Sequence, residues 1–150
     1  MRSWLKWTQG LKAMFGGVGT TFHLDVSPDV QTGTPLLRGY GDDYLEIAQT
    51  RYKQGLSLHQ GIILSPWGPD EVRQLEVMHL QHILEKPPEV LIIGTGRRTI
   101  FPNGEVLEQL TDTHMGFECM DSRAAARTYN ILIGEGRKTS VVFFLPNVRR

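Results

Sequence analysis

A short unbroken apolar run in the second half of the chain, VLII within the stretch EVLIIGTG at residues 89–96, constrains the fold most. A short run of this kind that ends in a glycine turn is typical of a strand covered on both faces. Helical spacing follows in residues 105–113 and 122–133. A strand pattern follows each helix, at residues 116–120 and 139–145. The order β, α, β, α, β with short connections predicts parallel strands joined by right-handed crossovers.

The preceding segment alternates apolar and polar residues with a period of two, as half-buried antiparallel strands do. We therefore predict a meander of three strands, over residues 43–48, 51–54 and 56–64. Gly61 interrupts the last of them, where a β-bulge would move the following side chains to the other face. A further strand pattern, residues 21–26, lies between loop-like stretches rich in glycine, serine and proline.

The stretch SPWGPDEV predicts the start of a helix. Pro69 suits a first helical position, and the two acidic residues that follow it suit the positive end of the helix dipole. Apolar residues recur at helical spacing as far as Leu84, and two consecutive prolines shortly afterwards would stop the helix. We therefore predict one helix over residues 69–84.

A chain of 150 residues suits one domain. We predict a single-domain mixed α/β sandwich over residues 36–147, with a central, mostly parallel sheet, flanking helices and an N-terminal antiparallel hairpin layer. Residues 1–35 form a partly flexible extension in this interpretation. Residues 1–15 combine spaced apolar and basic side chains without an acid, which suits weak contact with a membrane surface, an organelle presequence or a loose terminal extension.

The charge balance and the single cysteine exclude several classes of protein. Sixteen basic residues balance sixteen acidic ones, so no net field favours binding to nucleic acid. Cys119 alone cannot form an internal disulfide or a thiolate metal cluster, so a reducing compartment is the natural setting. The longest strongly apolar run, residues 141–145, is far shorter than the roughly 20 residues that span a bilayer, so we expect no integral membrane protein.

The loop GTGRRT, residues 94–99, follows the buried strand and raises the question of a ligand site. It fails as a dinucleotide fingerprint, because Thr99 stands in place of the third glycine and no helix begins there. If the two neighbouring strands are parallel, their carboxyl ends meet at one edge, where open α/β sheets receive ligands. The candidates for binding an anion or an acidic partner at this edge are Gly94, Thr95, Gly96, Arg97, Arg98, Ser122, Arg123, Arg127 and Asn130.

The helix over residues 122–133 supplies the other side of that edge. Its N-terminal amides and Arg123 would converge with Arg97 and Arg98, and exposed amides with guanidinium groups attract anions. In the alternative interpretation the arginines are simply solvated and Asp121 only caps the helix.

The same helix has a polar stripe and a side with small residues. Arg123, Arg127 and Asn130 recur at spacings of four and three, and the last two would reach the GEGR turn or a neighbouring loop. Small side chains permit close contact with a sheet while keeping a high helix propensity. The side expected to face the sheet consists of Ala124, Ala125, Thr128 and Leu132.

No set of residues indicates catalysis or a bound metal. His79 and His82 lie three positions apart with an acid nearby, but the HExxH pattern and a thiolate partner are absent, and a solvated polar face is the commoner outcome. No spacing selects Ser57 and His59 as a catalytic pair. Cys119 lies within a strand and suits a small apolar role rather than an activated thiolate. We expect no enzyme activity, no cofactor and no metal.

Three segments together resemble a known family: GYGDDYLEI, PEVLIIGTG and MDSRAAARTYNILIGEGR. They are similar to the Mth-like domain, a small family of unknown function whose eukaryotic member is the mitochondrial complex I assembly factor three. The resemblance covers about residues 39–145. This chain departs from the pattern at Ala126, where cysteine is frequent, and at Ser122, where threonine is common.

The resemblance implies a compact mixed α/β domain without assigned catalysis, cytoplasmic in bacteria or, alternatively, in the mitochondrial matrix. We expect a protein-interaction domain with an unidentified partner, one that helps to assemble a membrane respiratory complex through the surface near Arg97, Arg98 and Arg123. The alternative is a small-molecule or anion-binding protein, or an enzyme, that uses the same edge.

Overall fold

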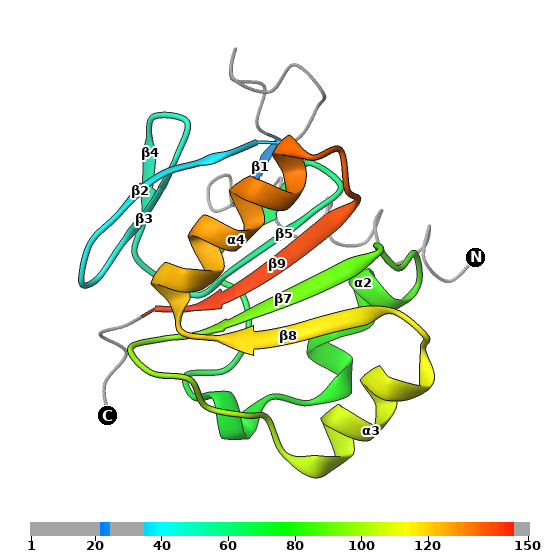
Figure 1. Cartoon of the computed structure of the whole chain (residues 1–150). Coiled ribbons are helices and arrows are strands. Elements are labelled where there is room, and N and C mark those ends of the chain that lie inside the picture. The colour runs from blue at the N-terminus through cyan, green and yellow to red at the C-terminus, as the bar shows by residue number, and fades with distance from the viewer. Residues whose placement is uncertain (1–21, 25–34, 146–150) are drawn as a thin grey trace.

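The computed structural model describes residues 22–24 and 35–145 and places a twisted six-stranded sheet at the centre of the molecule (Figure 1). Parallel pairing joins its last three strands, which confirms the parallel unit predicted for the second half of the chain. Beyond them the sheet continues antiparallel, so it is mixed, with two parallel and three antiparallel pairings among the described residues, rather than mostly parallel as predicted. The strand order is β1 (Phe22–Leu24), β6 (Ile62–Leu64), β5 (Leu56–His59), β9 (Thr139–Phe144), β7 (Val90–Thr95) and β8 (Gly116–Met120).

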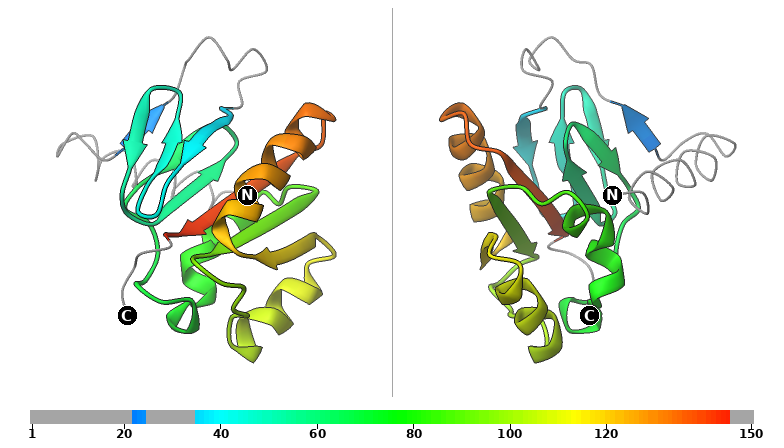
Figure 2. Two further views of the ribbon diagram at one scale, coloured as in Figure 1. Left: turned by 60° about the vertical axis from the view of Figure 1, so that its left-hand side comes forward. Right: turned by 90° about the vertical axis from the view of Figure 1, so that its right-hand side faces the viewer.

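A second, smaller sheet packs beside the central one (Figures 1 and 2). It is antiparallel and consists of β2 (Leu37–Tyr40), β3 (Leu45–Ile47) and β4 (Thr50–Tyr52). The last two lie within the predicted meander, whereas β2 escapes the sequence patterns because leucine, arginine, glycine and tyrosine do not alternate cleanly. The expected α/β class with an antiparallel hairpin layer is confirmed.

Two helices of the second half begin at side-chain caps that the sequence supplies. Helix α3 (Gly104–Asp112) begins where the Asn103 side chain accepts from the amide of Val106 at 3.1 Å. Helix α4 (Ser122–Gly134) begins where the Asp121 side chain accepts from the amide of Ala124 at 2.9 Å. Such caps stabilise a helix by about 1 kcal/mol each. The predicted helices therefore start within one residue of their observed positions.

The helix predicted over residues 69–84 is wrong. The segment forms two 3-10 turns, η1 (Val72–Gln74) and η2 (Val77–Leu80), followed by one short turn, α2 (Gln81–Leu84). Leu75 is extended, with ψ of 135°, and interrupts the segment. The side chains of Gln74 and His79 accept from the amides three residues before them, at 3.2 and 2.9 Å, so each turn closes on itself. A 3-10 turn repeats every three residues, so the spacing of its apolar side chains resembles that of an α-helix.

The bulge predicted at Gly61 is also wrong, because Gly61 lies in a tight hairpin turn. His59 pairs with Ile62, which leaves Gln60 and Gly61 as a two-residue connection between β5 and β6. Both have positive φ, 54° and 79°. A two-residue turn with both φ positive matches the right-handed twist of the strands, and glycine reaches this conformation without strain.

The central sheet separates two hydrophobic cores, because successive side chains of its strands point to opposite faces. One core lies beneath α4 and the small sheet, and the other lies beneath α3, α2 and the 3-10 turns (Figure 1). In β7 and β9 the first core takes Ile92, Val141 and Phe143, and the second takes Leu91, Ile93, Val142 and Phe144.

Helix α4 turns a different side to the sheet from the one predicted. Ala125, Ala126 and Tyr129 are fully buried, whereas Ala124 and Thr128 are only half-buried. The Tyr129 hydroxyl donates to the carbonyl of Pro35 at 3.1 Å. Pro35 lies just before β2, so the side of the helix that carries Tyr129 faces the small sheet. The helix is therefore rotated about its axis toward that sheet.

Some predictions concern residues outside the described ranges. The strand predicted at residues 21–26 is observed over 22–24, and the rest of it lies outside those ranges, as does the basic amphipathic segment 1–15. Within the described residues, no helix has the length and apolar character needed to cross a membrane.

Candidate functional site

Gly96 and Ser122 close the carboxyl edge of the parallel strands by bonding to each other. The amide of Gly96 donates to Ser122 Oγ at 2.8 Å, and the amide of Ser122 donates to the Gly96 carbonyl at 2.8 Å. Ser122 Oγ in turn donates to the carbonyl of Phe144, at the end of β9. The hydroxyl is buried and joins the ends of β7 and β9 to the start of α4. The predicted meeting of loop and helix at one edge is thus confirmed.

Gly94 lets α4 approach the sheet closely. A Cβ atom at this position would lie 2.9 Å from Phe143 Cδ1, 3.0 Å from Ala125 Cβ and 3.1 Å from Ser122 Oγ. These distances are shorter than normal van der Waals contacts, so only glycine fits without movement. Gly96 has φ of 96°, which L-residues rarely adopt. Both glycines of GTG therefore serve the packing of this edge.

Thr95 completes this internal network. Its buried hydroxyl lies 2.5 Å from the Arg98 carbonyl and 3.1 Å from the Met120 carbonyl, and it accepts from the amide of Ile100 at 3.1 Å. At the start of α4, three of the first four amides have acceptors within the chain, on Gly96 and Asp121. The edge therefore offers an anion fewer free donors than a typical helix N-terminus does.

The polar stripe on α4 binds the small sheet rather than the turn after the helix. Asn130 accepts from the amide of Leu37 at 2.9 Å and donates to its carbonyl at 2.7 Å, so one side chain satisfies both backbone groups of an edge residue. Arg127 donates to the Tyr40 hydroxyl at 3.1 Å. Arg123 pairs with Asp42 at 2.7 Å. These three residues therefore differ in role from the loop arginines, since they attach α4 to the small sheet and its β2–β3 turn.

Arg97 and Arg98 are exposed on the loop that follows β7. Neither forms an ion pair with the residues that the structure describes. Phe101, three residues further on, has 62% of its surface exposed, which is unusual for a phenylalanine. The sequence prediction missed Phe101. An aromatic residue just before a proline, outside every strand and helix pattern, was the available signal.

Two serine–histidine pairs lie side by side on the face of the sheet that α2 covers. Ser57 Oγ is 2.7 Å from His82 Nε2, and Ser140 Oγ is 2.7 Å from His59 Nδ1. The two imidazole rings meet edge to face, 5.9 Å between centroids. Burial lowers the pKa of His82 to about 3, with a smaller effect of His59. Burial, followed by the charge of Lys86, lowers the pKa of His59 to about 4, so both rings are neutral at pH 7.

Cys119 has no activated thiol. Burial, followed by the charge of Glu118, raises its pKa to about 11, and a thiol with so high a pKa is a poor nucleophile near neutral pH.

In residues 22–24 and 35–145, no group of three or more histidine, cysteine, aspartate or glutamate side chains is arranged to hold a metal ion.

Comparison with proteins of known sequence finds relatives in bacteria and vertebrates. A Francisella tularensis protein named "13 kDa major membrane protein" is 33% identical over 49% of this chain and 59% of its own length. A Danio rerio protein named "NADH dehydrogenase (ubiquinone) 1 alpha subcomplex assembly factor 3" is 36% identical over 48% of this chain and 41% of its own length. The chain therefore spans about half the length of these curated relatives.

Solved structures share the fold over most of the chain. An NMR structure from Xanthomonas campestris has a TM-score of 0.70 and 28% identity, over 85% of this chain and 92% of that one. A Bordetella pertussis protein described as a Mth938-like domain has a TM-score of 0.63 and 29% identity, over 82% of this chain and 92% of that one. A family model matches residues 37–144, nearly the whole described region. The chain therefore belongs to the family described as "Protein of unknown function (DUF498/DUF598)".

Proposed function

We propose that this chain is a non-enzymatic protein-interaction domain that assists the assembly of a membrane respiratory complex. The observation that carries the proposal is the similarity to vertebrate proteins named as assembly factors of NADH dehydrogenase, at 30 to 36% identity. An assembly factor acts by binding other polypeptides, so the chain needs an exposed surface with the composition of an interface.

The loop between β7 and α3 is the best candidate for that surface. We define the rim loop as residues 97–101. It carries Arg97 and Arg98, both exposed, and the exposed ring of Phe101. Arginine and aromatic residues are enriched in protein interfaces and supply most of their strongest contacts. The internal hydrogen bonds of Thr95 and Gly96 fix the base of the loop, which lowers the entropy lost on binding.

The charge of the rim loop favours an acidic partner surface. The guanidinium groups of Arg97 and Arg98 form no ion pair with the described residues, so a partner carboxylate would meet them without displacing an internal one. Arginine binds carboxylates in a two-pronged geometry that a lysine cannot reproduce. An acidic segment of a complex subunit, with an apolar residue to contact Phe101, has the matching chemistry.

The polar chemistry of the interior supports a role without catalysis. Ser57 is fully buried, so no substrate reaches its hydroxyl in this structure. The Cys119 thiol stays protonated. For an anion-binding protein or an enzyme that uses residues 94–99, the internal hydrogen bonds of Gly96 and Ser122 leave few free donors.

The test is crosslinking in the native host followed by purification of the tagged chain and identification of its partners. The test variant is Arg97→Ala, Arg98→Ala and Phe101→Ala combined. The control is Arg73→Ala with Met78→Ala, which removes an exposed arginine and a methionine that is 67% exposed, on another segment. We expect wild type and control to crosslink to subunits of the NADH dehydrogenase complex and the rim-loop variant to lose them. Identical partners for all three proteins would contradict the assignment of the surface.

A further inference from the structure

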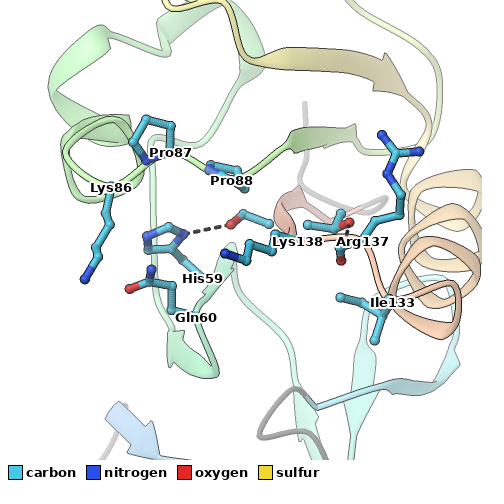
Figure 3. Close-up of a pocket in the computed structure, with 11 residues that line it drawn as sticks. His59, Gln60, Lys86, Pro87, Pro88, Ile133, Arg137 and Lys138 are labelled. Carbon is cyan, nitrogen blue, oxygen red and sulfur yellow. Dashed lines mark hydrogen bonds between the residues drawn. The ribbon is translucent and has the colours of Figure 1, made fainter.

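A cavity of about 380 Å³ opens at the end of the sheet opposite the rim loop (Figure 3). Its walls come from the turn after β5, the segment after α2 and the turn between α4 and β9. It lies at the amino end of β9, near Thr139 and Ser140, whereas Phe144 at the other end of that strand contacts Ser122. The cavity is therefore distinct from the predicted edge and from the surface proposed for a partner.

The lining is cationic. Lys86, Arg137 and Lys138 contribute to it, and none of the described lining residues is acidic. Arg137 also donates to Glu89, just outside the lining, at 3.0 Å, and that contact is half-exposed. Three cations at one concave site attract anions more strongly than dispersed surface cations do, because the low-dielectric walls focus the field.

His59 adds a buried donor to these cations. Its ring lines the cavity and is only 5% exposed. Nδ1 is the only acceptor that Ser140 Oγ contacts within the described part of the chain, so the serine hydroxyl donates there. In a neutral ring the proton then lies on Nε2, which has no hydrogen-bond partner among the described residues. In Figure 3 a dashed line marks the hydrogen bond of one ring nitrogen of His59, and the second nitrogen lies on the opposite side of the ring, toward Lys86.

A buried donor without an acceptor costs free energy, and native proteins seldom retain one without a reason. An anion bound in the cavity would supply the acceptor that Nε2 lacks, and Lys86, Lys138 and Arg137 line the same cavity. The apolar part of the lining, Pro87, Pro88 and Ile133, would cover an uncharged portion of the same ligand. This combination suits an organic phosphate, whose dianionic head carries several acceptors and whose remainder is small and apolar.

We propose that this cavity is a binding site for a small organic phosphate, held by the His59 Nε2 donor together with Lys86, Lys138 and Arg137. This site goes beyond the proposed interaction function and does not depend on it, since the rim loop contributes no residue to the cavity. An experiment can therefore contradict the phosphate site without contradicting the interaction function, and the reverse.

The test is titration of the ¹⁵N-labelled chain with inorganic phosphate and with phenyl phosphate, followed by NMR, with sodium chloride at matched ionic strength as the salt control. We expect saturable shifts of the Gln60, Gly136 and Lys138 amides and of the His59 Nε2 signal. Phenyl phosphate should bind more tightly than inorganic phosphate, because its ring gains contact with the prolines. Sodium chloride alone should leave these signals unchanged.

Charge-removing variants assign the site. Lys86 and Lys138 are exposed, so Lys86→Gln and Lys138→Gln should fold, and each should weaken binding by about tenfold, the effect of one charge-assisted contact. Arg97→Gln with Arg98→Gln, at the opposite edge, is the matched control and should leave the affinity unchanged. Absence of saturable shifts in wild type, shifts centred on the rim loop, or equal affinity in all variants would each overturn the proposal.

Discussion

The amides of Gly96 and Ser122 each donate to the other residue at 2.8 Å, so a strand end and a helix start form one closed unit. Ser122 Oγ extends the unit to the carbonyl of Phe144. Because all three groups are buried, none can exchange its partner for water. A residue that sequence analysis assigned to ligand binding therefore has a structural role that mutation can measure.

Ser122→Ala should lower the free energy of unfolding by about 2 to 4 kcal/mol, because it removes both hydrogen bonds of Ser122 Oγ and leaves the Gly96 amide buried without that acceptor. Urea denaturation checks the value. Thr99→Ala, at an exposed threonine nearby, is the control and should change stability by less than about 0.5 kcal/mol. Equal stability of the two variants would contradict the role given to Ser122.

Gly94→Ala should destabilise the chain by about 1 to 3 kcal/mol, because the new methyl group would collide with Phe143 and Ala125. Gly104→Ala is the comparison, and we expect it not to destabilise the chain. It adds the same methyl group within α3, where nothing lies within 4 Å, and the higher helix propensity of alanine should leave stability equal or increased. If both substitutions had the same effect, close packing would not explain Gly94.

Asn130→Ala should weaken the attachment of the small sheet to α4. The substitution removes two hydrogen bonds to Leu37, and we expect a loss of about 1 to 2 kcal/mol together with faster hydrogen exchange of the Leu37 amide. Arg123→Ala removes an exposed ion pair with Asp42 and a cation–π contact with Tyr40, 5.5 Å to the ring centroid, and should cost less than about 1 kcal/mol. Unchanged exchange at Leu37 in the Asn130 variant would contradict this attachment.

Acid should destabilise the fold through His59 and His82. Their pKa values in the folded state, about 4 and about 3, lie below the ordinary value of 6.5, so the unfolded chain binds more protons at mildly acidic pH. The stabilisation is complete above pH 6.5 and is lost as pH falls toward the folded pKa values. Between pH 6.5 and 5 the loss should be roughly 1.5 kcal/mol per histidine.

Denaturation of wild type and of the His59→Gln, His82→Gln double variant at both pH values checks this. The double variant lacks both titrating rings and should lose distinctly less stability over the same interval. Parallel pH profiles for the two proteins would show that other groups govern acid unfolding.

The sequence predicted those parts of the fold that depend on local patterns. The β7 run located one buried strand, and the helical spacing in residues 105–113 and 122–133 located two helices. The prediction failed where the same spacing of apolar residues fits more than one type of secondary structure. Residues 72–84 keep their apolar side chains about three apart in short turns as well as in an α-helix. The extended backbone at Leu75 and the side-chain bonds of Gln74 and His79 distinguish the two structures.

The features of the candidate site that the sequence did not predict depend on contacts between residues far apart in the chain. The partner of Asn130 is Leu37, 93 residues away, and the partner of His59 is Ser140, 81 residues away. No spacing in the sequence encodes either pair. The loop and the helix start were correctly expected to meet, because parallel strands bring their carboxyl ends together, but the direction of the Arg123 side chain toward Asp42 depends on the second sheet.

The measurement that tests the central claim most directly is the amount of assembled NADH dehydrogenase complex on native gels of host membranes after deletion of the gene for this chain. We expect the assembled complex to decrease and its subcomplexes to accumulate, with recovery on expression of wild type or of the Arg73→Ala, Met78→Ala control but not of the rim-loop triple variant. An unchanged amount of assembled complex after deletion, or full recovery with the triple variant, would contradict the account.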